Sequence, residues 1–363
     1  MTRAARVRAA LSAAAALGLA SYLAVPANAS SRPVPARASG QHAAANATAR
    51  PVYVGGYAGN SVTDWLSASQ PSQIGPLQVE KDWFPTSTPP RMLPSSFHDT
   101  MCYKLYTRTP SQDPVCLISY KDTTPTGQLV NTPLKSFIAS IPPAHAPVIM
   151  IFYMEPEVTL WDYNCAGTLK RKPAYSSGAQ YVQEFEAQSS LIRKYAAQDG
   201  LTNVQVADGA GVDAYNPQTH GGGCKSEDYY GSNCSYIPPP AYVNHYLTEV
   251  YHPHLVLLQS DARFQRWNSC TTGLHRTRGI SDYALGNCTT NGSTFTEADR
   301  EAVLADDAAY LGRQFPTLYL WSYFWFQLPH PAKCQAYKFP AASSSSPQTA
   351  KEWEGIEAGT VKS

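Results

Sequence analysis

An apolar run that ends in two carboxylates is the feature of this sequence best suited to chemistry. Val148 to Met154 is rich in β-branched and bulky side chains, as in a strand covered on both faces, and Glu155 and Glu157 follow it. Pro156 has no N–H for a ladder hydrogen bond, so we expect the strand to end there. Barrel enzymes place catalytic groups at the carboxyl ends of such strands, which makes Glu155 the first catalytic candidate. A surface turn that happens to be acidic is the alternative, and Glu157 is interpreted as an orienting or solvated acid.

A second carboxylate, Asp282, lies in another short apolar segment, Gly279 to Tyr283. Strand alternation predicts that Ile280 and Asp282 share a face, and it predicts a shared face in the earlier strand for Ile149, Ile151, Tyr153 and Glu155. Cleavage of a glycosidic bond commonly uses two facing carboxyl groups, one protonated as the acid and one ionised as the nucleophile or base. Glu155 as the acid and Asp282 as the ionised partner form the best such pair.

Other residues near the expected strand ends are candidates for substrate binding. Tyr153, Tyr215 and Trp321 have rings with apolar faces and polar edges, which suit stacking on sugars or hydrogen bonding to them. A place in the hydrophobic core is the alternative for Trp321. Asp213 either binds substrate or caps a loop, and Lys121 either binds substrate or is a surface lysine.

Expected strands alternate with helical or loop segments, which predicts a parallel sheet. The strands are expected over 52–57, 115–120, 148–154, 204–207, 212–215, 279–283 and 318–323. An amphipathic helix is expected over 181–197, and a second helix, with Thr296 as N-cap, is expected over 296–315. This order over about 290 residues predicts an α/β protein, most economically a (β/α)8 TIM barrel. A doubly wound sheet is the rival, but no glycine-rich phosphate loop supports it.

The segments around both carboxylates resemble those of family 26-like glycoside hydrolases, which belong to the retaining barrel clan. Tyr153-Met154-Glu155-Pro156-Glu157 resembles the acid/base strand, strand four, and Gly279 to Ala284 resembles strand seven with its nucleophile. Val212 to Pro217 resembles the strand-six segment, and Trp321 resembles the final-strand tryptophan of the sugar platform. The resemblance implies a barrel that hydrolyses glycosidic bonds, with Glu155 as acid/base and Asp282 in the position of the nucleophile.

Two positions depart from that family. Its mannan-cleaving members carry His before the acid/base Glu, where this chain has Met154, and their strand-seven nucleophile is Glu, where this chain has Asp282. Aspartate is one methylene shorter, so it fits either an inverting mechanism through water, with carboxyl groups roughly 6.5–9.5 Å apart, or a loss of catalysis. A catalytically inactive carbohydrate-binding barrel, a pseudoenzyme, is therefore the alternative function.

The start of the chain reads as an export signal. Residues 1–29 contain early arginines, an apolar segment over 9–25 and a small-x-small cleavage pattern. The apolar segment is too short and too rich in alanine for a convincing membrane span. Residues 30–50 predict a disordered leader, 51–340 the catalytic-type barrel and 341–363 a tail. We therefore expect a secreted, extracellular protein without membrane attachment once the signal is removed.

All eight cysteines lie beyond the export signal, and an even number in an exported chain indicates disulfides. Sequence alone does not fix the connectivity, but proximity favours Cys102–Cys116, Cys224–Cys234, Cys270–Cys288 and Cys165–Cys334. Zinc is the alternative, although the chain has no Cys-x-x-Cys pair and no histidine at ligand spacing beside the cysteines. We expect no metal and no other cofactor.

Composition and missing motifs narrow the function further. The formal net charge is +1 and no basic run interleaves with aromatic residues, so we expect no nucleic-acid partner. The chain has no Gly-x-Ser-x-Gly elbow of a serine hydrolase and no convincing Asp/His ligand set of a metal-dependent deacetylase. We expect a monomeric hydrolase of O-glycosidic bonds, whose substrate is a polysaccharide or oligosaccharide.

Overall fold

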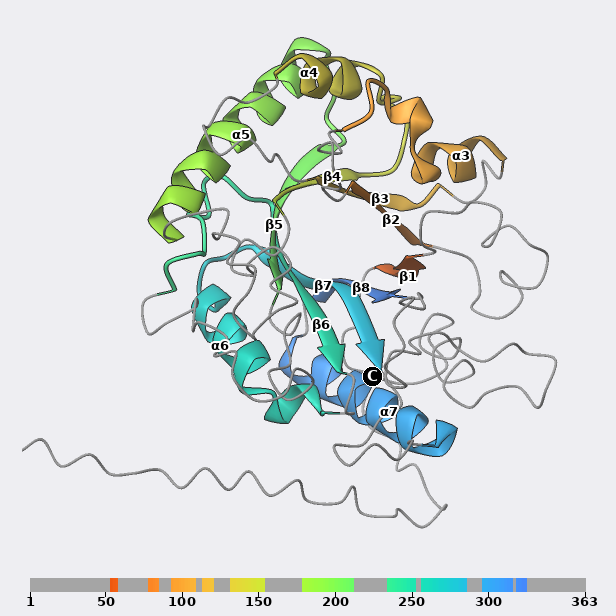
Figure 1. Cartoon of the computed structure of the whole chain (residues 1–363), viewed down its shortest axis with the longest axis vertical. Coiled ribbons are helices and arrows are strands. Elements are labelled where there is room, and N and C mark those ends of the chain that lie inside the picture. The colour runs from red at the N-terminus through yellow and green to blue at the C-terminus, as the bar shows by residue number, and fades with distance from the viewer. Residues whose placement is uncertain are drawn as a thin grey trace, which may run out of the picture. The chain divides into compact units, whose positions relative to one another are not determined.

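Eight parallel strands close into a barrel, which confirms the expected (β/α)8 class. The strands are β1 (Tyr53–Tyr57), β2 (Val79–Phe84), β3 (Val115–Tyr120), β4 (Val148–Phe152), β5 (Val204–Gly211), β6 (His245–His252), β7 (Thr277–Leu285) and β8 (Leu318–Phe324). Each strand pairs with the next along the chain, and β8 pairs with β1 (Figure 1). The carboxyl ends of all eight strands therefore meet at one end of the barrel.

The structure is a computed structural model. It describes residues 53–57, 78–84, 93–108, 113–120, 131–153, 178–211, 234–252, 256–285, 296–315 and 318–324. All of these belong to one compact unit, Ala43–Ser363. The expected export signal, leader and tail lie outside the described residues.

The described helices lie outside the ring of strands (Figure 1). They are α3 (Met101–Arg108), α4 (Asn131–Ala139), α5 (Gly178–Gln198), α6 (Ala262–Thr271) and α7 (Glu297–Gln314), with 3-10 turns η1 (Phe97–Asp99) and η2 (Leu258–Ser260). The two predicted helices correspond to α5 and α7, and α7 begins with a capping box between Thr296 and Asp299. Among these helices, none combines the length and the apolar character that crossing a bilayer requires.

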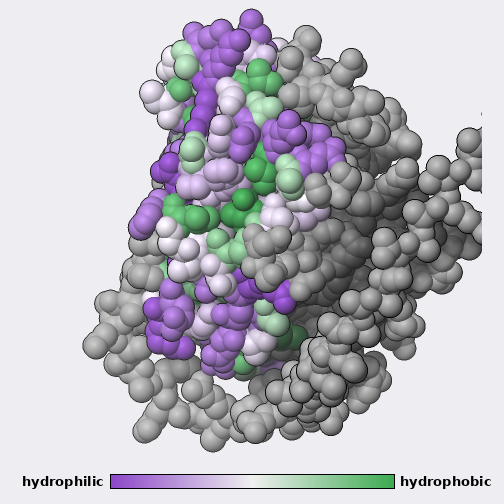
Figure 2. All heavy atoms as spheres, turned by 90° about the vertical axis from the view of Figure 1, so that its left-hand side faces the viewer, coloured by the Kyte–Doolittle hydropathy of each residue, from purple (hydrophilic) through white to green (hydrophobic). Residues whose placement is uncertain are grey.

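Apolar side chains form one cluster inside the barrel and another between the barrel and its helices. The lumen cluster consists of Val79, Val115, Leu117, Ile149, Ile151, Ala207, Leu247 and Leu320. The larger helix-side cluster contains the alternate residues of the strands, such as Ile118, Met150 and Ile280, packed against helix residues such as Phe185 and Leu304. The face that carries α5 mixes hydrophilic and hydrophobic residues (Figure 2). Burial of the two clusters determines which strand residues point into the lumen and which point towards the helices.

Two strands were not expected from the sequence. β2 (VEKDWF) and β6 (HYLTEVYH) both interrupt their apolar residues with charged ones, so neither forms an apolar run. The expected strand over 204–207 is longer than predicted, because β5 runs unbroken from Val204 to Gly211, and the expected strand over 212–215 lies outside the described residues. The resemblance of Val212 to Pro217 to strand six is therefore wrong in position, since that segment follows strand five.

One of the expected disulfides is confirmed and two are wrong. Cys102 on α3 bonds to Cys116 on β3, as proximity predicted. Cys234 bonds to Cys270 on α6, which excludes the expected Cys224–Cys234 and Cys270–Cys288 pairs. The βα arrangement of the barrel brings the segment before β6 beside α6, although 36 residues separate the two cysteines. The remaining expected pair, Cys165–Cys334, lies outside the described residues.

Candidate functional site

A lysine and two carboxylates meet inside the barrel. Lys81 Nζ lies 2.6 Å from Glu249 Oε1 and also donates to Asp282 Oδ2. The three side chains are buried, with Asp282 the most exposed at 2%. Lys81 follows the lumen residue Val79 by two positions, and Glu249 follows Leu247 by two. The group therefore lies one step beyond the apolar lumen cluster, towards the carboxyl ends of the strands.

A β-bulge on β7 directs Asp282 into the lumen. Thr248 pairs with Ile280, but the next residue, Glu249, pairs with Asp282, so Ser281 is the extra residue. Ile280 belongs to the helix-side cluster, whereas Asp282 contacts Lys81 inside the barrel. The prediction that Ile280 and Asp282 share a face is therefore wrong. A regular strand would place Ser281, not Asp282, on the inward face.

Each charge of this group perturbs the others. Burial raises the pKa of Asp282 well above its usual value, the neighbouring Glu249 raises it further, and Lys81 opposes both effects. Burial alone lowers the pKa of Lys81, but the charges of Asp282 and Glu249 outweigh it and raise that pKa. Glu249 and Asp282 share the single positive charge of Lys81, which favours a state in which one of the two carboxyls is protonated. The group can therefore store or release a proton inside the barrel.

Sequence reasoning missed Lys81 and Glu249 because it missed their strands. Glu249 stands in Tyr246-Leu247-Thr248-Glu249-Val250-Tyr251, whose aromatic and β-branched residues are typical of a strand and were the available signal. Lys81 stands between Glu80 and Asp82, which reads as a solvated segment. Only pairing with β3, whose residues are all buried, shows that this charged segment is a barrel strand.

Five of the predicted site residues lie outside the described residues: Lys121, Glu155, Glu157, Asp213 and Tyr215. The position of Glu155 along the chain can still be given, because β4 ends at Phe152 and Tyr153 follows it. Glu155 thus comes three residues after the end of β4 along the chain, and its role as acid/base stays a prediction. Asp282 on β7 is the other member of the predicted pair.

Tyr153 does not continue the alternation of β4. Its backbone N–H donates to Tyr120 O at 2.8 Å, but its φ is 52°, in the left-handed region that non-glycine residues rarely adopt. The side chain belongs to the helix-side cluster with Phe152, whereas Ile149 and Ile151 line the lumen. The predicted shared face therefore does not extend to Tyr153. A strained residue two positions before Glu155 changes the direction of the chain there.

Trp321 lies on the helix-facing side of β8. Its ring meets that of Tyr283 edge-on, with centroids 5.2 Å apart, and the Tyr283 hydroxyl donates to Asp307 on α7 at 2.6 Å. Only 1% of Trp321 is exposed. The sequence left two alternatives for Trp321, a place in the hydrophobic core and a sugar platform. The structure places it in the core, where its ring has no free face for a sugar.

The opposite end of the lumen holds a neutral histidine. His245 at the start of β6 stacks on Tyr319, with ring centroids 4.1 Å apart, and its Nε2 donates to Gln205 Oε1 at 2.5 Å. Its Nδ1 accepts from the hydroxyl of Thr277. Burial lowers the pKa of His245 to about 4. The barrel therefore carries its charges near the carboxyl ends and an uncharged polar group near the amino ends.

Comparison with solved structures identifies the type of barrel. The modular endo-β-1,4-mannanase of Cellulomonas fimi, a family 26 glycoside hydrolase, matches with a TM-score of 0.52 over 85% of this chain and 70% of its own, at 11% identity. A double mutant of the C. fimi mannanase matches with a TM-score of 0.50 over the same shares, at 12% identity. The fold of this chain is similar to that of these family 26 glycoside hydrolases. No family model matches the sequence, and no curated protein does. At this identity the likeness is one of fold alone.

Proposed function

We propose that this protein is a secreted glycoside hydrolase that cleaves O-glycosidic bonds of a polysaccharide with two carboxyl groups. The observation that carries the proposal is the inward group of Lys81, Glu249 and Asp282 near the carboxyl ends of the barrel strands. Barrel enzymes build their active sites at that end. The family 26-like fold supports glycosidic bonds as the target.

The cost of burying these charges supports a functional reason for them. Moving an ion from water into a protein interior costs several kcal/mol, and replacing a buried ion pair by apolar residues is often neutral or stabilising. The adjacent part of the lumen is packed with valine, leucine and isoleucine, so apolar residues could also pack where the charged group lies. Buried, strongly perturbed titratable groups cluster at active sites, which favours that interpretation here.

The proposed mechanism gives each carboxyl one role. Glu155, after β4, protonates the leaving oxygen of the glycosidic bond, which requires a raised pKa. Asp282 in its ionised form acts as nucleophile, or as the base that activates water, and the charge of Lys81 opposes the burial that raises the pKa of Asp282. Glu249 competes for the same lysine, so a proton held by Glu249 leaves Lys81 to Asp282. Glu157, Asp213, Tyr215 and Lys121 remain our proposed substrate contacts.

Two disulfides support export of the chain. Such bonds persist in oxidising compartments and are rare in reducing ones. Cys102–Cys116 and Cys234–Cys270 fit the expected secreted, extracellular location. We propose a monomer that meets its polysaccharide outside the cell.

A carbohydrate-binding pseudoenzyme is the second candidate, and the burial of Asp282 favours it. A carboxylate that is 2% exposed and ion paired to Lys81 has no open path to a sugar unless the neighbouring chain moves. Binding to a glycan without turnover would then be the function that the fold retains.

The test measures release of reducing ends from a panel of β-linked polysaccharides. Glu155→Gln and Asp282→Asn are each expected to lower the rate by at least about 100-fold, because each removes a group that transfers a proton or attacks. Asp199→Asn is the matched control, since Asp199 is an exposed acid beyond the end of α5. Far-UV circular dichroism checks folding. Glycan binding without turnover by the parent protein would favour the pseudoenzyme, and full activity in Glu155→Gln would refute the mechanism.

A further inference from the structure

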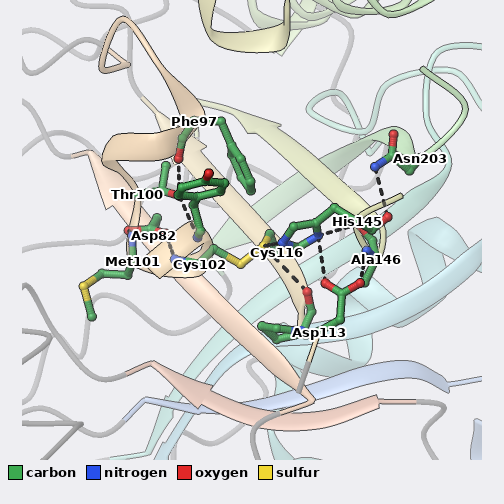
Figure 3. Close-up of a disulfide and its surroundings, with 12 residues drawn as sticks. Asp82, Phe97, Thr100, Met101, Cys102, Asp113, Cys116, His145, Ala146 and Asn203 are labelled. Carbon is green, nitrogen blue, oxygen red and sulfur yellow. Dashed lines mark hydrogen bonds and ion pairs between the residues drawn. A yellow bond between two sulfur atoms is a disulfide. The ribbon is translucent and has the colours of Figure 1, made fainter. Parts of the chain in front are cut away.

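A buried histidine lies against one disulfide on the helix-facing side of the barrel. Figure 3 shows His145 between the Cys102–Cys116 disulfide and Asp113. His145 Nε2 is 3.7 Å from Cys116 Sγ, and the two sulfurs and one ring nitrogen all lie within 4.8 Å of one another. Both cysteines are fully buried and His145 is 4% exposed. His145 is 29 residues from Cys116 along the chain, so cysteine and histidine spacing gave no sign of this group.

Hydrogen bonding leaves one nitrogen of His145 open towards the sulfur. The other nitrogen, Nδ1, lies 2.9 Å from Ala146 O and 3.2 Å from Asp113 Oδ1. Both partners are acceptors, so the ring proton belongs on Nδ1 and the lone pair of Nε2 faces Cys116. Histidines that ligate metals are held in this way, with a carboxylate or a carbonyl on the far nitrogen.

A buried carboxyl without a partner lies beside this group. Glu80 is fully buried, and neither of its carboxyl oxygens has a hydrogen-bond partner. Leaving such a group unsatisfied costs about 1–3 kcal/mol or more. Glu80 on β2 pairs in register with Cys116 on β3, so the two side chains leave the sheet on the same side. The Glu80 carboxyl is not among the ligand atoms that lie within 4.8 Å of one another, so its use as a ligand requires the side chain to turn towards the sulfurs.

We propose that, once this disulfide is reduced, Cys102, Cys116, His145 and Glu80 bind one zinc-class divalent cation. Thiolate, imidazole and carboxylate are the donors that zinc takes in tetrahedral sites. Asp113 orients His145 from behind. Cys102 stands in the first turn of α3, whose Met101 and Cys102 N–H groups donate to the Asp82 carboxylate at 3.0 Å each. The cation and the disulfide are then alternative ways to fasten α3 onto β3.

The chemistry balances with an ordinary thiol or phosphine reductant. Reduction adds two electrons and two protons to the disulfide, giving two thiols, while a dithiol reductant is oxidised to its own disulfide or a phosphine to its oxide. Binding of the cation then releases the thiol protons as the two thiolates form bonds to the metal. The oxidised protein has no thiolate to offer and is expected to bind no cation here.

The test adds Co²⁺, as a spectroscopic stand-in for Zn²⁺, to the full chain with and without prior reduction by a phosphine. The reduced protein is expected to bind one Co²⁺ at this site, with a thiolate-to-cobalt absorption band that Zn²⁺ abolishes, and the oxidised protein is expected to show no band. His145→Ala keeps all eight thiols and is expected to lose the band. Asp113→Asn should weaken binding about 10- to 100-fold.

Matched variants separate this site from the other thiols of the reduced chain. A Cys234→Ser/Cys270→Ser double variant removes the other described cysteine pair and is expected to keep the band. Glu80→Gln is expected to weaken binding, with circular dichroism as the check on folding. Equal binding by His145→Ala and the parent, or loss of the band only in Cys234→Ser/Cys270→Ser, would overturn the proposal. A reduced chain that is unfolded and that Zn²⁺ does not refold would overturn it too.

Discussion

Lys81 on β2 and Glu249 on β6 come from opposite walls of the barrel and form an ion pair of 2.6 Å through its lumen. Three strands separate β2 from β6 in either direction around the closed sheet. Asp282 on β7 joins the pair from the neighbouring strand. The ammonium group of Lys81 therefore connects Asp282, the proposed ionised carboxylate, with Glu249 across the barrel. Replacing Lys81 has consequences that can be measured.

Lys81→Met is expected to destabilise the protein strongly at neutral pH. The change removes the Lys81 charge from the buried carboxyls Glu249 and Asp282, and losing one partner of a buried ion pair costs about 3–5 kcal/mol. At pH 4 both carboxyls can hold protons, so the loss in the free energy of unfolding should be smaller there. Urea denaturation at pH 4 and pH 7 measures the difference.

The control for this prediction is Lys194→Met, because Lys194 is an exposed lysine on α5. It should change the free energy of unfolding by no more than about 0.5 kcal/mol. A loss in Lys81→Met that is the same at both pH values would show that packing of the side chain, rather than its charge, is what the barrel needs.

Two of the strands that were predicted from the sequence, β3 and β4, carry no charge in the lumen. β3 and β4 are buried along their whole length, and the apolar runs that predicted them are their direct signature. α7 was predicted with Thr296 as its N-cap and acidic residues in its first turn, which are local features. Such elements follow from residues that are neighbours in sequence.

The two strands that were not predicted from the sequence, β2 and β6, carry Lys81 and Glu249. A charged residue facing a lumen is stabilised only by partners from distant strands, so no local pattern distinguishes it from a solvated residue. The bulge at Ser281 is equally invisible, because it depends on the register of β6 with β7. The Cys234–Cys270 bond follows from proximity in space, whereas the sequence offered only proximity along the chain.

His245 predicts a loss of stability in mild acid. Its pKa is about 4 in the folded protein and about 6.5 when unfolded, so the unfolded chain takes up a proton first. The stability from neutral His245 is complete above pH 6.5 and is lost as the pH falls towards 4, by up to about 3 kcal/mol. His245→Gln removes this titration, so unfolding free energies measured from pH 7 to pH 4 should fall less steeply.

His275→Asn serves as the histidine control. His275 is exposed, and its φ of 53° suits asparagine, which tolerates the left-handed region. Its pH profile should match that of the parent protein. The same acid sensitivity in His245→Gln and the parent would assign the effect to other groups.

The Cys234–Cys270 bond is expected to be found in the purified, unreduced protein and to stabilise it. A digest of the unreduced protein should yield one linked peptide pair that contains both cysteines. Replacing both by serine should lower the free energy of unfolding by about 2–4 kcal/mol, because the bond closes a loop of 36 residues. A peptide in which Cys234 is linked to Cys224 would contradict this prediction and support the pairing expected from proximity along the chain.

The separation between the carboxyl groups of Glu155 and Asp282 tests the proposed mechanism most directly. A crystal structure with a bound oligosaccharide should show both groups facing one pocket, about 5–5.5 Å apart for a retaining enzyme or about 6.5–9.5 Å apart for an inverting one. The missing methylene of Asp282 favours the larger value. Carboxyl groups on different sides of the barrel, or an Asp282 that stays closed off behind Lys81 while the sugar is bound, would contradict the two-carboxylate account.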